Sequence, residues 1–89
     1  MVRIRFTGLL ADRIGGINSV EVAAATVESA LRALTGQYPK LTRLVWSGEN
    51  VVNPMMAIFL NGQLLGAAQL GAAVKAGDQI EIVPAVSGG

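Results

Sequence analysis

The chain has 89 residues, which is enough for one domain and not for two. Apolar residues make up 52% and charged residues 15%, and the net charge of +1 at pH 7 argues against a basic nucleic-acid-binding face. Cysteine and histidine are absent, which excludes disulfides, thiol catalysis, imidazole acid–base chemistry and the usual zinc sites. No apolar run approaches the roughly 20 residues of a membrane-spanning helix, and the N-terminus does not look like a signal peptide. We therefore expect a cytoplasmic protein that does not act at a membrane.

The first quarter of the sequence predicts a pair of strands. Residues 2–7 alternate apolar and polar side chains with the period of a half-buried strand, and residues 19–22 do the same. Gly15 and Gly16 indicate a turn between these two segments. We therefore expect a hairpin with a long loop over residues 8–17.

Residues 26–36 predict the principal helix. Thr26 is a good N-cap residue, and Glu28 lies in the first turn, where the helix dipole favours an anion. The i, i+3, i+4, i+7 spacing then gives one apolar face, formed by Val27, Ala30, Leu31 and Leu34. Gly36 stands where a left-handed C-cap residue is expected.

The second half predicts strands joined by turns. A brief helical spacing over residues 41–45 precedes a surface loop at 47–54, and residues 56–60 have the length of a strand. Asn61-Gly62 is the strongest hairpin signal, because a type I′ turn needs positive φ at both central positions. Residues 63–65 then form a short return strand and residues 70–75 one helical turn. A last strand over residues 79–83 ends at Pro84, which has no backbone N–H to donate.

This order of elements predicts an α+β domain over residues 1–84, with one main helix packed on a mixed four- to five-stranded sheet. The order resembles that of the β-grasp, or ubiquitin-like, fold, in which the first and last strands lie parallel in the middle of the sheet. The predicted inward side chains are Val2, Ile4, Phe6, Val20, Val22, Val27, Leu31, Leu34, Ile58, Ile80 and Ile82. On the opposite face we expect Glu21 and Glu81 to lie beside Arg3 and Arg5.

Residues 85–89, Ala-Val-Ser-Gly-Gly, predict a flexible tail with a free carboxylate. Glycine has no Cβ, so Gly88 and Gly89 can pass through a narrow channel. A carboxylate acylates poorly until adenylation by ATP supplies a better leaving group, after which a sulfur nucleophile can displace AMP and leave a thiocarboxylate. Taken alone, a Gly-Gly pair is more simply a floppy end. The β-grasp order and the end at the second glycine favour the functional interpretation.

Three segments of the C-terminal third follow a known pattern: Ile-Phe-Leu-Asn-Gly at 58–62, Gly-Asp-Gln-Ile-Glu-Ile at 77–82, and Val-Pro-Ala-Val-Ser-Gly-Gly at 83–89. On these segments the chain resembles the ThiS/MoaD family of sulfur carriers. The resemblance implies that Gly89 is adenylated by an E1-like enzyme that uses ATP, and that it then carries sulfur as a thiocarboxylate. It further implies that Val86, Ser87 and Gly88 thread into partner active sites. The chain would be a protein cosubstrate rather than an enzyme, and would itself bind no cofactor and no metal.

The pathway stays open at this point. Small subunits of molybdopterin synthase often have Pro-Pro where this chain has Pro84-Ala85, and the Pro-Ala variant is similar to carriers that serve cysteine biosynthesis. Thiamin carriers are usually shorter and lack a loop like residues 47–54. The sulfur acceptor would be a molybdopterin synthase large subunit or an enzyme of the cysteine synthase type, supplied through a separate sulfur donor. The alternatives are a ubiquitin-like modifier joined through Gly89 to lysines, and a β-grasp interaction domain with an inert tail.

Phe59 and Val83 form a second candidate site. If residues 56, 58 and 60 face the core, Phe59 points outward, and Val83 on the neighbouring strand does the same. An exposed aromatic side chain beside an exposed valine is a candidate partner surface, with cover by a loop or by the tail as the alternative. Met55, Met56 and Trp46 are expected in the core or at its margin.

Overall fold

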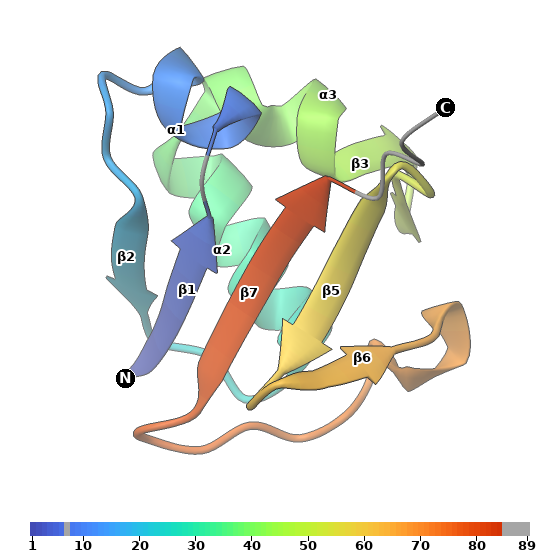
Figure 1. The fold of residues 1–89 in the computed structure, drawn as a ribbon. Coiled ribbons are helices and arrows are strands. Elements are labelled where there is room, and N and C mark those ends of the chain that lie inside the picture. Colours follow the sequence, from blue (N-terminus) through green and yellow to red (C-terminus); the bar gives the residue numbers. More distant parts are fainter. Residues whose placement is uncertain (7, 85–89) are drawn as a thin grey trace.

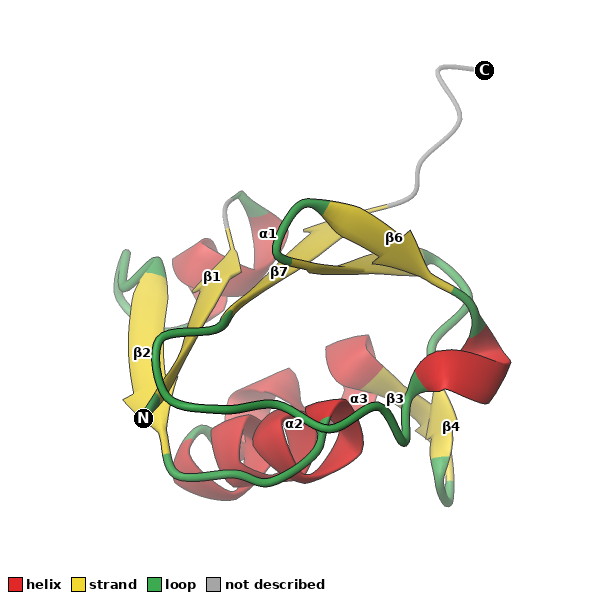
Figure 2. Ribbon diagram, turned by 90° about the horizontal axis from the view of Figure 1, so that it is seen from below, coloured by secondary structure: helices red, strands yellow, loops and turns green. Residues whose placement is uncertain are grey.

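A mixed five-stranded sheet with the order β2-β1-β7-β5-β6 forms one layer of the protein, and the main helix packs beneath it (Figures 1 and 2). The computed structural model describes residues 1–6 and 8–84. The strands of this sheet are β1 (Val2–Phe6), β2 (Ser19–Val22), β5 (Met56–Leu60), β6 (Gln63–Leu65) and β7 (Gln79–Pro84). The predicted β-grasp architecture is confirmed.

Helices and a small second sheet complete the fold. The helical segments are α1 (Leu9–Arg13), α2 (Val27–Gln37), η1 (Pro39–Leu41), α3 (Thr42–Val45) and η2 (Ala67–Gln69). Two short strands, β3 (Trp46–Gly48) and β4 (Val51–Val52), pair with each other apart from the main sheet.

The centre of the sheet is a parallel pair of strands, β1 and β7. Ile4 lies beside Ile80 and Phe6 beside Ile82, while β2 and β5 flank the pair in antiparallel register. Because side chains alternate between the two faces of a strand, these apolar residues all point toward α2. All eleven side chains predicted to face inward are buried, with at most 7% of their surface exposed.

The outer face of β1 follows the predicted charge pattern. Arg3 lies beside Glu21 of β2, and Arg5 lies beside Glu81 of β7. Directly opposed unlike charges on a sheet stabilise by roughly 0.2–1 kcal/mol per pair. The charges on this half of the outer face therefore largely neutralise one another.

Helix α2 begins as predicted and ends differently. The Thr26 hydroxyl accepts the Ser29 backbone N–H at 3.1 Å, and the Ser29 hydroxyl accepts the Thr26 N–H at 3.0 Å, which completes a capping box. The prediction that Gly36 is a left-handed C-cap is wrong, because α2 continues through Gln37 and its C-cap is Tyr38. A residue before proline is disfavoured in the helical conformation, so Pro39 sets this end.

Two predicted loops contain regular structure. Residues 8–17 include α1, which carries the fully buried Leu10, and residues 47–54 include most of β3 and all of β4. A five-residue helix and strands of two or three residues are too short to show a hydrophobic period in the sequence. The loop predictions for both segments are therefore wrong.

The helical turn predicted over residues 70–75 is also wrong. The short helix η2 precedes this segment, and the segment itself lies along the start of α2. The carbonyl of Ala72 accepts the Val27 N–H at 3.0 Å, and that of Leu70 accepts the Glu28 N–H at 2.9 Å. The first N–H groups of a helix have no partner within the helix, and the carbonyls of this segment satisfy two of them instead of forming a helical turn.

Two leucine-to-alanine substitutions test the assignment of the core. Leu31 on α2 is fully buried, so Leu31→Ala should lower the free energy of unfolding by about 2–5 kcal/mol, through lost burial and the cavity left behind. Leu64 on β6 is 59% exposed, and Leu64→Ala should change it by less than about 0.5 kcal/mol. Urea unfolding of both variants measures the difference. Equal unfolding midpoints for the two would contradict this core.

Candidate functional site

The last strand of the described residues, β7, lies in the middle of the sheet. Strand β7 lies between β1 and β5, and because it runs parallel to β1, both strands end at the same edge (Figure 1). Pro84, beside Met56 of β5, is still part of β7 and is the last described residue before the tail. The predicted reactive residue Gly89 and the predicted threading residues Val86, Ser87 and Gly88 lie outside the described residues.

Phe59 and Val83 both lie on the outer face of the sheet. Phe59 is half-buried and lies between Glu81 of β7 and Leu64 of β6, while Val83 is 39% exposed and lies beside Ala57. Leu64, which the sequence did not single out, has most of its surface exposed. These four side chains form the outer apolar patch: Ala57, Phe59, Leu64 and Val83. Figure 2 shows α2 and α3 on the opposite side of the sheet.

The Asn61-Gly62 turn and the turn before β7 are joined by hydrogen bonds. Asn61 and Gly62 have φ values of 49° and 85°, as the predicted type I′ turn requires. The Asn61 side chain accepts the Gln79 N–H at 2.9 Å through Oδ1 and donates to the Asp78 carboxylate at 3.2 Å through Nδ2. The Asn61 N–H donates to the Gln79 carbonyl at 2.8 Å. Two of the three segments that carry the family resemblance therefore meet here, in a structural role.

Asp78 is the acceptor at the centre of this arrangement. Its carboxylate accepts the Lys75 backbone N–H at 2.9 Å as well as the Asn61 amide. The Lys75 hydrogen bond, followed by the Asn61 hydrogen bond, holds the pKa of Asp78 below its ordinary value. Hydrogen bonds to the ionised form produce a shift in this direction.

Side-chain contacts fasten the β3–β4 hairpin to α2. The Trp46 indole N–H donates to the Thr35 hydroxyl at 3.2 Å, and that hydroxyl donates to the Leu31 carbonyl at 3.2 Å. The Arg32 guanidinium lies 4.4 Å from the centre of the Trp46 ring and also donates to the Asn50 side chain. A cation–π contact at an exposed site contributes about 0.5–1 kcal/mol. Trp46 is therefore part of the core margin, as predicted.

Met55 and Met56 differ in burial. Met56 is buried, as predicted, whereas Met55 is 54% exposed and the prediction for it is wrong. Met55 follows Pro54 in the turn that precedes β5, where no strand alternation fixes the direction of a side chain.

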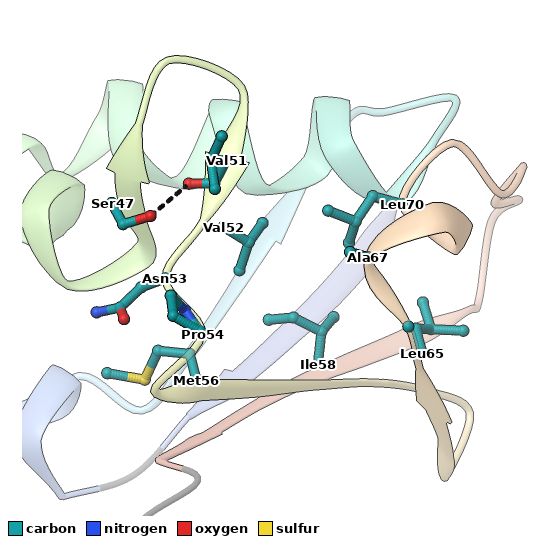
Figure 3. Close-up of a pocket in the computed structure, with 11 residues that line it drawn as sticks. Ser47, Val51, Val52, Asn53, Pro54, Met56, Ile58, Leu65, Ala67 and Leu70 are labelled. Carbon is teal, nitrogen blue, oxygen red and sulfur yellow. Dashed lines mark hydrogen bonds between the residues drawn. The ribbon is translucent and has the colours of Figure 1, made fainter.

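A cavity of about 370 Å³ lies between β5, β6 and the segment around β4 (Figure 3). Figure 3 shows that its lining is mainly apolar, with Met56, Ile58 and Leu65 on the side of the sheet. The polar Asn53 on its rim donates to the Leu44 carbonyl at 3.0 Å and accepts the Met55 N–H at 2.9 Å, so its amide is already engaged. Sequence reasoning missed this cavity because it depends on the β3–β4 hairpin.

The described residues contain neither a cluster of metal ligands nor a membrane-spanning helix. Within residues 1–6 and 8–84, no three acidic side chains come together as a metal site would require. In the same part of the chain, no helix has both the length and the apolar character needed to cross a membrane.

Comparison with known proteins decides the family. The model of the ThiS family matches residues 4–89. The chain belongs to the ThiS family. It is 37% identical over 86 residues to Small archaeal modifier protein 1 of Haloferax volcanii. The matched region covers 91% of this chain and 95% of that protein. This is a family of small ubiquitin-like modifiers and sulfur carriers rather than of catalytic enzymes.

Solved structures of relatives have the same fold. The crystal structure of the Haloferax volcanii modifier has a TM-score of 0.85 at 32% identity, covering 99% of this chain and 98% of the other. A chain in the crystal structure of the Amycolatopsis orientalis BexX/CysO complex has a TM-score of 0.86 at 27% identity, covering 100% of both chains. A chain in the complex of subunits 1 and 2 of Molybdopterin-converting factor from Helicobacter pylori has a TM-score of 0.65 at 26% identity. The match covers 99% of this chain and 97% of the other. The latter two are complexes with a second protein.

Asp78→Asn tests the link between the two turns in this ThiS-family chain. The folded-state pKa of Asp78 is lowered, so the carboxylate stabilises the fold fully above the unfolded pKa of about 3.9, and this contribution is lost as the pH falls through the folded pKa. Asp78→Asn should therefore unfold at lower urea than wild type at neutral pH, and the difference should shrink as the pH falls below about 4. Asp12→Asn, which removes the same charge from an exposed side chain on α1, is the control. A pH-independent difference for Asp78→Asn would contradict the assignment.

Proposed function

We propose that this ThiS-family chain is a sulfur carrier whose working group is the carboxylate of Gly89. The carboxylate oxygen attacks the α-phosphate of ATP on an E1-like activating enzyme, which releases pyrophosphate and leaves an acyl-adenylate. A sulfide nucleophile from the sulfur donor then attacks the acyl carbon, the bond to the AMP oxygen breaks, and a thiocarboxylate remains. The chain itself binds no cofactor in this scheme, since ATP belongs to the partner. Cytoplasmic ATP would support the cycle.

The observation that carries this proposal is the family match over residues 4–89, which includes the final Gly-Gly pair. The fold supports it, because β7 lies in the centre of the sheet and directs the chain out at one edge. The composition supports it as well. The sequence has no cysteine, so no thiol side chain could carry the sulfur in place of the Gly89 carboxylate. Val86, Ser87 and Gly88 would follow Gly89 into the partner's active site.

For the pathway we favour cysteine biosynthesis over molybdopterin. The Pro84-Ala85 pair is similar to carriers that serve cysteine biosynthesis, and the accepting enzyme would then be of the cysteine synthase type. The alternative acceptor is a molybdopterin synthase large subunit. The likeness to a chain of the Helicobacter pylori complex supports this alternative, at a lower TM-score of 0.65.

A second function has its own support. The 37% identity to Small archaeal modifier protein 1 favours a ubiquitin-like modifier, joined through Gly89 to lysine side chains of target proteins. The same adenylated carboxyl group serves both functions, because an amine can attack the acyl carbon in place of sulfide. The attacking nucleophile therefore distinguishes the two.

We propose further that the outer apolar patch contacts the protein partners. Leu64 and Val83 expose apolar surface on a sheet face that carries mostly charged groups elsewhere. Val83 also lies in the same strand as the exit point of the tail, so a partner that holds the tail can reach this patch at the same time. The aromatic Phe59 at its centre is a residue type enriched at interfaces.

Intact-protein mass spectrometry tests the proposed chemistry. Given ATP, the cognate activating enzyme and a sulfide source, the chain should gain the mass of one sulfur in exchange for one oxygen, and the change should map to Gly89. Deleting Gly89, or adding one residue after it, should abolish the conversion and leave the unfolding temperature nearly unchanged. Thiolation of the extended variant, or sulfur at an internal residue, would refute the carrier proposal. Conjugates to lysine would support the modifier function.

Leu64→Asp tests the partner surface. A charge in the outer apolar patch should raise the KM of the activating enzyme for this chain by about tenfold, because a desolvated carboxylate at an interface has no partner. Val51→Asp places the same charge at a side chain of similar exposure on β4, away from the patch, and should change KM by less than about twofold. Equal KM values for the two variants would exclude the patch from the interface.

A further inference from the structure

A second surface feature lies among the helices, away from the outer apolar patch. A cleft of about 320 Å³ opens between the end of α1, which supplies Arg13 and Ile14, and the junction of α2 and η1, which supplies Gln37, Tyr38, Pro39 and Lys40. Both cationic side chains are exposed, and none of the residues that line the cleft is acidic. We name this feature the basic cleft.

The charge in the basic cleft is less balanced than on the sheet. Arg3 and Arg5 on β1 each lie beside a glutamate of a neighbouring strand. Arg13 and Lys40 instead come from different segments and share one cleft, and Arg43 follows Lys40 by three residues along the continuing helical path of η1 and α3. Asp12 precedes Arg13 on α1 but does not line the cleft. The basic cleft therefore concentrates positive charge in a chain whose net charge is only +1.

The residue types and the position of the basic cleft suit a protein partner. Arginine and tyrosine are enriched where interfaces bury surface, and Tyr38 is half-buried beside Pro39. Helix α1 follows the end of β1, and β7 ends at that same edge of the sheet (Figure 1). A partner that holds the chain beyond Pro84 therefore approaches the edge of the molecule that carries the cleft.

We propose that the basic cleft docks an acidic segment of the activating enzyme, with its Asp and Glu carboxylates on Arg13 and Lys40. This inference rests on the proposed function and names a contact for its first step, which the carrier and modifier functions share. A carrier must bind and leave its activating enzyme in every cycle. Opposite charges at the edge of an interface raise the association rate without requiring a large buried contact.

Both cations also lie close to the C-terminal ends of helices, where positive charge stabilises the helix. A role limited to the fold would change the unfolding temperature of the free chain and would leave the KM for the enzyme unchanged. A docking role would raise KM while kcat stays the same. Both quantities therefore have to be measured on the same variants.

The chain has two lysines, and they provide a matched pair of variants. Lys40→Glu reverses one charge in the basic cleft, and Lys75→Glu reverses one exposed charge in the turn before β7, at the opposite edge of the sheet. The assay is ATP–pyrophosphate exchange by the cognate activating enzyme, with wild type, Arg13→Glu and both lysine variants. Low and high salt are compared, because screening weakens exposed charge pairs. The double variant Arg13→Gln/Lys40→Gln repeats the test without adding acidic groups near the helix ends.

Lys40→Glu and Arg13→Glu should each raise KM about five- to tenfold at low salt with kcat unchanged, and the difference from wild type should narrow at high salt. The neutral double variant should raise KM by a similar factor, and Lys75→Glu should stay within about twofold of wild type. Equal KM values for the Lys40 and Lys75 variants, or a KM increase for Lys40→Glu that salt does not reduce, would overturn the inference and leave the carrier proposal standing. Absence of exchange with wild type would overturn both.

Discussion

The parallel pairing of β1 with β7 is the constraint on which the rest of this structure depends. Parallel neighbours cannot be joined by a tight turn, so the chain between them has to cross over and return. All the other helices and strands lie in that crossover, and α2 covers the apolar face that the pairing creates. The same pairing fixes the place where β7 ends, because parallel strands in register finish at the same edge of the sheet.

The segment before β7 connects this centre to the remainder of the fold. On one side it satisfies the first N–H groups of α2 through the carbonyls of Leu70 and Ala72, and on the other it holds the Asn61 turn through Asp78. The Asn61-Gly62 and Gly77-Asp78 pairs are therefore explained by hydrogen bonding within the domain. The chemistry proposed for the protein involves none of these side chains, so a related domain could keep both pairs and lack a reactive tail.

The sequence was sufficient for the layers and the core. Strict alternation in residues 2–6 and 79–83, and the apolar stripe of α2, are long enough to identify both the elements and their inward faces. Leu10 and Val45 were missed as core residues because α1 and α3 are shorter than two helical turns, and such segments are set by tertiary contacts rather than by local pattern. Gly36 was misread for a related reason, since Pro39 three residues later decides where α2 ends.

The candidate sites also differ in how far the sequence alone could indicate them. Strand parity alone places Phe59 and Val83 on the outer face, because parity depends only on counting residues along a strand. Leu64 joins them only through the register between β5 and β6, and the basic cleft brings together residues more than twenty positions apart, which no spacing rule could have indicated.

The geometry of β1 and β7 also has a mechanical consequence. The N-terminal end of β1 and the C-terminal end of β7 lie at opposite edges of the sheet, so a force that pulls the two ends of the domain apart acts along both strands. The hydrogen bonds across the four register pairs, from Arg3–Gln79 to Phe6–Ile82, then bear the load together rather than one after another. Unfolding in shear of this kind resists force far better than opening a hairpin from its end. A partner or unfoldase that pulls the C-terminal segment away from the N-terminal end of β1 therefore loads these hydrogen bonds in shear.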